Sequence, residues 1–124
     1  MVKSSLSQRQ FKFTMMVAKL ILYAYGMGYT LTLGEAWRPQ EMQDLYLKTG
    51  KTKVKYSKHQ DRLAIDLNLF MGGRFLTDKE SYRILGEYWE HLSDENVWGG
   101  RFGVRKEDYD KKVGWDPGHF QNGE

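Results

Sequence analysis

Residues 59–69 of the chain read HQDRLAIDLNL, and this stretch decides the fold that we expect. Apolar residues take every second position of its latter part, at Leu63, Ile65, Leu67 and Leu69. Because successive side chains of a strand point to opposite faces, this alternation predicts a strand with one face in the core. Asp66 lies on the other face. His59 comes seven residues before it, so both side chains reach one point if the chain bends between them.

A long helix is predicted ahead of this strand. Ser7 followed by Gln10 has the form of a capping box, which marks a helix start. Apolar residues then recur at helical spacing up to Gly26 and Gly28. The expected buried stripe consists of Phe13, Met16, Val17, Leu20, Ile21 and Ala24.

Shorter elements are predicted between this helix and the strand. Residues 29–36 alternate apolar and polar side chains, as a half-buried strand does. Pro39 suits the first turn of a short helix that Gly50 would end. Lys51, Lys53 and Lys55 then alternate through a loop or an edge strand.

The second half of the chain completes the expected fold. Residues 71–74 (MGGR) predict a turn, and Thr77 with Glu80 has the form of a second capping box. The helix behind it would bury Tyr82, Leu85, Trp89 and Leu92. Short strands joined by a polar loop are expected over residues 97–120. The chain is therefore predicted to have an α+β fold, with helices packed against a small, mainly antiparallel sheet.

Length and composition limit the possible sites. The 124 residues suit one domain, which we place at residues 1–124. The chain has no cysteine, so disulfides and thiolate metal sites are excluded, and any metal must be bound by His, Asp or Glu. Residues 13–28 are apolar behind a basic start, but Lys19 interrupts them and no small-residue cleavage site follows. We expect a monomer made in the cytoplasm, without a signal peptide or a membrane-spanning segment.

The net charge of +3 conceals an asymmetry along the chain. Residues 1–58 carry 10 Lys/Arg and 3 Asp/Glu, whereas residues 59–124 carry 9 and 13, so the two parts have charges of +7 and −4. Five lysines lie between Lys48 and Lys58. A basic patch attracts nucleic acid, an anionic envelope polymer or a membrane surface alike. A nucleic-acid-binding domain is one reading, but no recognition signature accompanies the lysines, so we expect no specific nucleic acid partner.

The three histidines differ in their surroundings. His91 lies near the end of a predicted helix, where the helix dipole favours a partly protonated imidazole, so we expect a structural role. His59, Asp66 and His119 would provide three protein ligands and leave a fourth position for water, as a catalytic zinc site requires. Asp116 precedes a proline and can be either a turn residue or a general base beside the metal. Spacing alone leaves both roles open.

Two segments resemble the signatures of zinc peptidases that cleave peptidoglycan stem peptides. Residues 57–66 (SKHQDRLAID) resemble the signature S-x-H-x-x-G-x-A-x-D, and residues 116–120 (DPGHF) resemble the second signature, D/E-x-x-H. Residues 98–100 (WGG) resemble the phage enzymes of this group. The group includes vancomycin-resistance dipeptidases and carboxypeptidases and phage L-alanyl-D-glutamate endolysins.

The resemblance implies a role for each site residue. His59, Asp66 and His119 would bind one zinc ion, and Asp116 would be the catalytic base. Arg38 falls where the family places an arginine that stabilises the oxyanion formed from the scissile carbonyl, a role that suits a permanently charged guanidinium with several fixed donors.

Two further residues are candidates for supporting the site. Ser57 could hydrogen-bond a ligand or the substrate. Trp115, with Trp37 and Trp98, could line a substrate groove, although large aromatics in a small domain are mostly core, which we expect for two of these three. Arg62 stands where the family has a glycine, and would strain the loop if that glycine served a positive backbone angle.

The function implied by the resemblance is hydrolysis of cell-wall stem peptides by a zinc-activated water. A phage-type L-alanyl-D-glutamate endopeptidase, released to the cell wall, fits the small chain best. The alternatives are a D-alanyl-D-alanine carboxypeptidase and a non-catalytic zinc-stabilised binding module, since hedgehog-type signalling domains share the fold.

Overall fold

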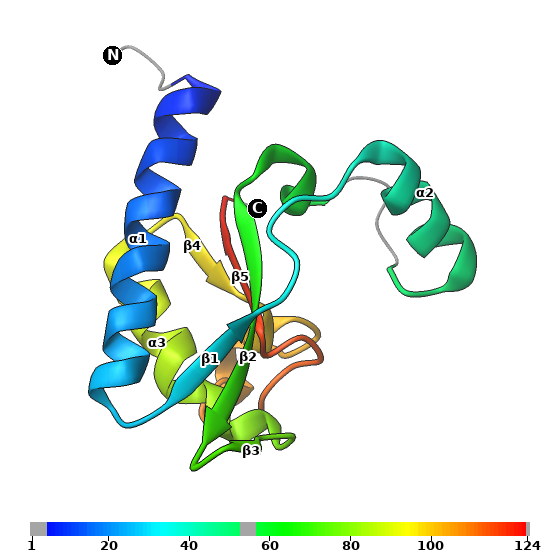
Figure 1. The fold of residues 1–124 in the computed structure, drawn as a ribbon. Coiled ribbons are helices and arrows are strands. Elements are labelled where there is room, and N and C mark those ends of the chain that lie inside the picture. The colour runs from blue at the N-terminus through cyan, green and yellow to red at the C-terminus, as the bar shows by residue number, and fades with distance from the viewer. Residues whose placement is uncertain (1–4, 53–56, 124) are drawn as a thin grey trace.

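The computed structural model describes residues 5–52 and 57–123, in which three helices accompany a five-stranded sheet (Figure 1). The helices are α1 (Leu6–Gly26), α2 (Gln40–Thr49) and α3 (Arg83–Leu92). The strands are β1 (Thr30–Leu33), β2 (Ala64–Met71), β3 (Arg74–Phe75), β4 (Asn96–Trp98) and β5 (His119–Asn122). Single 3₁₀ turns cover η1 (Lys58–Asp61), η2 (Lys79–Tyr82), η3 (Gly99–Arg101) and η4 (Lys106–Asp108).

The sheet is built around β2. Its strand order is β1-β2-β5-β4, and β3 forms a short hairpin with the end of β2. All four pairings are antiparallel, with β1 along residues 67–70 of β2 and β5 along residues 64–66. The predicted α+β fold with an antiparallel sheet is confirmed.

The core lies between one face of this sheet and two helices. The alternate leucines and isoleucine of β2 are buried there, as their period of two predicts. α1 and α3 lie side by side against them, and Phe13 of α1 meets Trp89 of α3 edge to face, with ring centroids 5.6 Å apart. The opposite face of β2 carries Asp66, so the helices leave that face open for chemistry. Within the described residues, no helix is long and apolar enough to cross a membrane.

α2 lies away from the sheet and from the other two helices (Figure 1). It begins after Pro39 and ends at Gly50, whose φ of 82° is in the left-handed region that glycine adopts without strain. The predicted end at Gly50 is confirmed, whereas Pro39 lies one residue before the first turn, as the N-cap, and not in it. Lys53 and Lys55 lie outside the described residues.

Both predicted capping boxes are wrong in position. Helix α1 starts two residues earlier, with a reciprocal box between Ser5 and Gln8, which have the same spacing as Ser7 and Gln10. Ahead of α3, the carboxylate of Asp78 accepts a hydrogen bond from the backbone N–H of Ser81, in place of the predicted Thr77 and Glu80 pair. Aspartate is the stronger N-cap because its charge also suits the positive end of the helix dipole.

Candidate active site

The register between β2 and β5 brings Asp66 and His119 together. The two residues are direct partners across the antiparallel pair, so their side chains leave the same face of the sheet. Phe120 and Asn122 alternate with them and point into the core. The pattern of β5 therefore dedicates one face to packing and the other to His119 and Gln121.

His59 is placed by the turn η1 rather than by a strand. Ser57 and Gln60 form a reciprocal capping box around this turn, and the Ser57 hydroxyl also accepts a hydrogen bond from the backbone N–H of His59 at 3.2 Å. The carbonyl of His59 accepts hydrogen bonds from the backbone N–H groups of Arg38 and Arg62, each at 3.2 Å. Ser57 thus shapes the backbone of the candidate ligand His59 and makes no hydrogen bond to its ring within the described residues.

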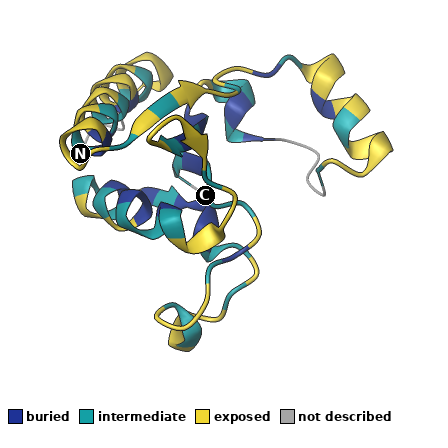
Figure 2. Cartoon of the chain, turned by 60° about the horizontal axis from the view of Figure 1, so that its bottom comes forward, coloured by how far each residue is buried: buried dark blue, intermediate teal, exposed yellow. Residues whose placement is uncertain are grey.

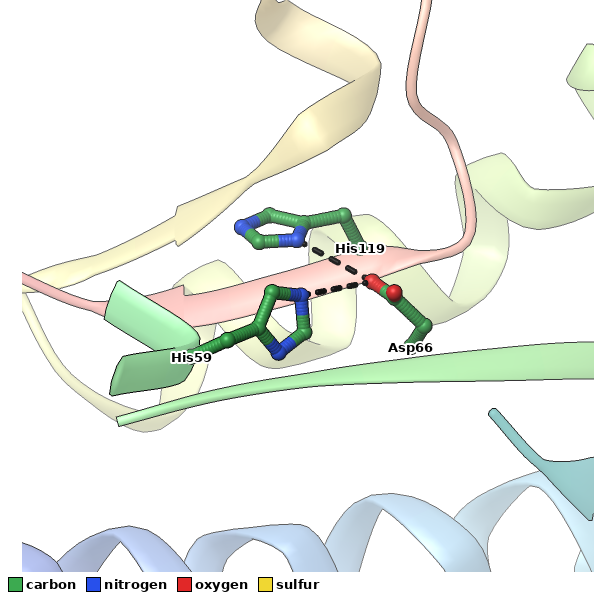
Figure 3. A group of neighbouring side chains, drawn as sticks. All are labelled: His59, Asp66 and His119. Atoms are coloured by element: carbon green, nitrogen blue, oxygen red, sulfur yellow. Dashed lines mark hydrogen bonds and ion pairs between the residues drawn. The ribbon is translucent and has the colours of Figure 1, made fainter. Parts of the chain in front are cut away.

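Three donor atoms converge between these elements (Figure 3). Nε2 of His59 and Nδ1 of His119 lie 3.2 and 3.1 Å from the same Oδ1 of Asp66. A tetrahedral zinc ion with bonds of 2.0–2.1 Å holds its ligand atoms about 3.3 Å apart, which these separations match. All three ligand atoms lie within 4.8 Å of one another, so the residues fit a single metal ion.

The electrostatics of this cluster agree with a cation site. Burial raises the pKa of the Asp66 carboxyl, but hydrogen bonds and charge from His119 and His59 lower it more, so the pKa lies well below its usual value. Burial lowers the pKa of His119, whereas the hydrogen bond and charge of Asp66 raise it above its usual value overall. Asp66 is thus ionised, as a ligand must be, and metal binding would displace a proton from His119.

The outer nitrogen of His119 has a partner that fixes its role. Nε2 lies 2.6 Å from Oε1 of Gln121, whose own amide nitrogen donates to the carbonyl of Gly123 at 2.7 Å. This arrangement presents the amide oxygen to the ring, so Nε2 carries a proton. Once metal binding displaces the proton between Nδ1 and Asp66, Nδ1 would offer its lone pair to the metal. The outer nitrogen of His59, Nδ1, is buried and has no hydrogen-bond partner within the described residues.

Asp116 lies beside the cluster, with Oδ2 3.8 Å from Nδ1 of His119 and a side chain that is 42% exposed. Its loop is held by close contact with Gly99, where an added Cβ would lie 2.0 Å from the Asp116 carbonyl oxygen. Trp98 donates from Nε1 to the carbonyl of Pro117 at 2.7 Å. Partial burial raises the pKa of the Asp116 carboxyl despite the opposing charge of His119. Asp116 is thus a second carboxylate beside the cluster, in addition to Asp66, and it is not needed as one of the three metal ligands.

Arg38 is buried against α2 and held on several sides. Its Nε donates to Glu35 at 2.6 Å and its Nη1 donates to Gln43 at 2.7 Å, while Nη2 forms an ion pair with Glu35. Its guanidinium also lies over the ring of Tyr46, 4.7 Å from the centroid. The charge of Arg38 lowers the pKa of Asp116, so the two groups are close enough to interact. Among the residues that the structure describes, these contacts account for three of the five guanidinium N–H groups.

Arg62 has a φ of 58° and is the one residue other than glycine with a positive φ in the described part of the chain. The left-handed conformation expected for the family's glycine is thus present, and it costs an arginine about 1–2 kcal/mol. The Arg62 guanidinium lies 4.8 Å from the ring centroid of Trp37, a contact that offsets part of this cost.

The remaining candidates lie further from the cluster. Trp98 is fully buried, but Trp37 and Trp115 are 48% and 62% exposed, so the prediction that two of the three are core is wrong. Each lies in a loop directly before a site residue, Trp37 before Arg38 and Trp115 before Asp116, and contacts its neighbours with only part of its ring. His91 is exposed at the end of α3, outside the cluster.

Sequence reasoning missed Gln121 and Glu35 as supporting residues, and it noted Gly99 only as part of the segment at residues 98–100. For Gln121 a signal existed, because a residue two positions after His119 on a strand shares its face. Nothing in the local sequence indicated that Glu35 would hold Arg38, since that contact depends on how the loop before α2 bends.

Comparisons with known proteins agree with this architecture. No family model and no curated protein sequence matches the chain. Among solved structures, the L-Ala D-Glu endopeptidase ChiX of Serratia marcescens superposes with a TM-score of 0.68 and 17% identity, over 90% of this chain and 77% of that one.

Two structures of vancomycin-resistance enzymes also match. A mutant of the D,D-pentapeptidase VanY from a VanB-type resistance cassette, in complex with Zn(II), gives a TM-score of 0.55 and 21% identity over 90% of this chain and 70% of that one. VanYB in complex with D-alanine-D-alanine gives 0.56 and 20% over 90% and 69%. These proteins belong to the group that the two sequence signatures resemble. The chain therefore has the fold of the endopeptidase ChiX and the VanY peptidases, as the resemblance predicted.

Proposed function

We propose that this protein is a zinc-dependent peptidase that hydrolyses stem peptides of bacterial peptidoglycan. The convergence of His59, Asp66 and His119 on one point, with the Asp116 carboxylate beside it, carries the proposal. The fold supports it, because solved structures that share the fold include an L-Ala D-Glu endopeptidase, a D,D-pentapeptidase with Zn(II) and a complex with D-alanine-D-alanine.

The metal and the protein divide the chemistry. Bound zinc supplies a water whose pKa is lowered to about 7 and polarises the scissile carbonyl. Asp116 accepts the proton of the attacking water and returns it to the amine that leaves, so that one peptide bond and one water become a carboxylate and an amine. Its half-exposed side chain suits this work, since it meets both the ligand His119 and the incoming peptide.

Arg38 stabilises the oxyanion that forms on the carbonyl oxygen. Its side chain is fixed by Glu35, Gln43 and Tyr46, so little reorganisation is needed when charge develops. The two donors not engaged by these partners would face the carbonyl oxygen. Trp115, exposed next to Asp116, provides an apolar wall for the peptide.

We further propose that the bond cleaved is the L-alanyl-D-glutamate bond, in the manner of a phage endolysin that reaches the wall after release. The higher TM-score with the endopeptidase ChiX, 0.68 against 0.55 and 0.56 for the VanY structures, favours this bond over D-alanyl-D-alanine. The lysines between Lys48 and Lys58 would draw the enzyme to the anionic wall.

Digestion of purified muropeptides tests both the peptidase activity and the identity of the bond that is cleaved. Mass spectrometry of the products should show a new amino terminus on D-glutamate, and a chelator should abolish it until zinc is restored. Release of terminal D-alanine alone would establish the carboxypeptidase in its place. Absence of any product from zinc-loaded protein would support the non-catalytic zinc module and overturn the peptidase.

A further inference from the structure

The outer face of α1 is apolar although it faces solvent. We define this face by five residues spaced four, three, four and three apart, which therefore form one stripe along the helix: Phe11, Met15, Ala18, Leu22 and Tyr25. The side chains of its four large members are between 49% and 73% exposed. Figure 2 shows this side of the helix in the colour of exposed residues.

The exposure follows from the way α1 packs. Phe13, Leu20 and Ala24 are buried against the sheet and α3, and at 100° per residue they lie about half a turn away from Leu22 and Phe11. A helix that is apolar on both faces is expected to be covered on both. The stripe spans 15 residues, about 21 Å along the helix axis. Contiguous exposed apolar surface of this kind marks an interaction site.

The charges next to the stripe indicate what covers it. Residues 1–34 contain four Lys/Arg and no Asp or Glu. Lys12 and Lys19 are seven residues apart, so they flank the outer face on one side. A second copy of α1 would bring these lysines together with no carboxylate on either helix to pair with them. A bilayer with anionic headgroups offers hydrocarbon to the stripe and negative charge to the lysines.

We propose that the outer face of α1 is a docking surface for an anionic lipid bilayer. The helix would lie in the interface, with Phe11, Met15 and Leu22 at the level of the upper acyl chains and Lys12 and Lys19 among the headgroups. Asp66 leaves the opposite face of the sheet, so the docked protein would keep its candidate active site directed away from the bilayer. The inference goes beyond the proposed peptidase function and stands without it.

Binding of the full chain to vesicles tests the proposal. Vesicles of phosphatidylcholine alone are compared with vesicles that contain about one third phosphatidylglycerol, and bound protein is measured by flotation. Wild type should float with the anionic vesicles. Met15→Gln with Leu22→Gln should lower the affinity more than about tenfold because it removes the apolar contact. Lys12→Gln with Lys19→Gln should lower it about 30-fold.

Leu33→Gln is the matched control, since Leu33 is 67% exposed on β1, outside the stripe, and its replacement should leave vesicle binding unchanged. Circular dichroism checks that each variant folds. Equal binding by the Met15 and Leu22 variant, or equal binding to both kinds of vesicle, would overturn the proposal. So would a dimer in light scattering that Leu22→Gln dissociates, because the stripe would then serve a second copy.

Discussion

His119 and His59 bring the same imidazole group to the candidate zinc site, but the protein holds the two rings in different ways. His119 lies on a strand, in register with Asp66. Its outer nitrogen, Nε2, is hydrogen-bonded to the side-chain oxygen of Gln121 at 2.6 Å. His59 lies on a single 3₁₀ turn, and its outer nitrogen is buried without a partner in the described residues.

The difference separates the site into two halves. The strand half, which includes Asp116 and Gln121, is oriented by the sheet and by its own hydrogen bonds. The turn half is oriented by the capping box of Ser57 and by the contact of Nε2 of His59 with Asp66 at 3.2 Å, and its outer nitrogen adds no further hold. We infer that the strand half is preformed and that bound metal fixes the turn half.

The largest effect is expected for Asp116→Asn, which tests whether the chemistry belongs to the strand half. Removal of a general base lowers kcat by about 10²–10⁴. Zinc content should stay the same, because Asp116 is not one of the three ligands. Muropeptide turnover and metal analysis on the same sample measure the two quantities. Asp110→Asn, at an exposed aspartate in the same part of the chain, is the control. Loss of zinc together with activity would contradict the assignment.

Removal of zinc should affect the two halves unequally. A ligand present at about 1,000 times its Kd lowers by about 1,000-fold the population of any open state that must release it. The amides of Arg62 and Leu63, which close the η1 turn, should therefore exchange up to about 1,000-fold faster in the chelated protein. The amides of β5 should change far less, because the contacts of His119 with Asp66 and Gln121 persist. Hydrogen exchange measured by mass spectrometry that accelerates equally in both halves would refute the division.

Gln121→Leu should weaken zinc binding about 10–100-fold, the usual effect of losing the outer partner of a metal-bound histidine. Gln121→Glu should largely restore the affinity, since a carboxylate also accepts from Nε2 of His119. Competition with a chromophoric chelator measures both. Gln10→Leu is the matched control in the turn half, where Gln10 donates to the Asp61 carbonyl at 2.6 Å without touching a ligand ring. If Gln10→Leu weakened zinc binding as much as Gln121→Leu, the outer partner of His119 would have no special role.

The sequence predicts what lies within a short segment better than what joins distant segments. Two local patterns carried the correct predictions. The alternation along β2 was enough for the fold class. The short segments that hold His59, Asp66, Asp116 and His119 were enough for the candidate ligands and the candidate base. The register that pairs Asp66 with His119 joins residues 53 positions apart. Local patterns do not determine such a pairing. Gln121 was missed although the period of a strand places it on the same face as His119.

The wrong predictions have two origins. Whether Trp37 and Trp115 are buried depends on which surfaces remain free after the core has closed, and composition alone favours burial of any tryptophan. The capping box of α1 was misplaced for a different reason, since overlapping Ser-x-x-Gln patterns two residues apart predict the same helix with different starts.

The smallest expected effect, and a test of what holds the turn half, comes from Arg62→Gly. Glycine relieves a left-handed strain of about 1–2 kcal/mol, but the substitution also removes the cation–π contact with Trp37, about 0.5–1 kcal/mol at an exposed site. A more flexible unfolded chain offsets the gain further, so the free energy of unfolding should change by less than about 1 kcal/mol. In a Trp37→Ala background no contact is lost, and the same substitution should stabilise by about 1 kcal/mol. Urea unfolding of the four zinc-free proteins measures this cycle; an equal effect in both backgrounds would mean that the Trp37 contact does not help to hold the turn.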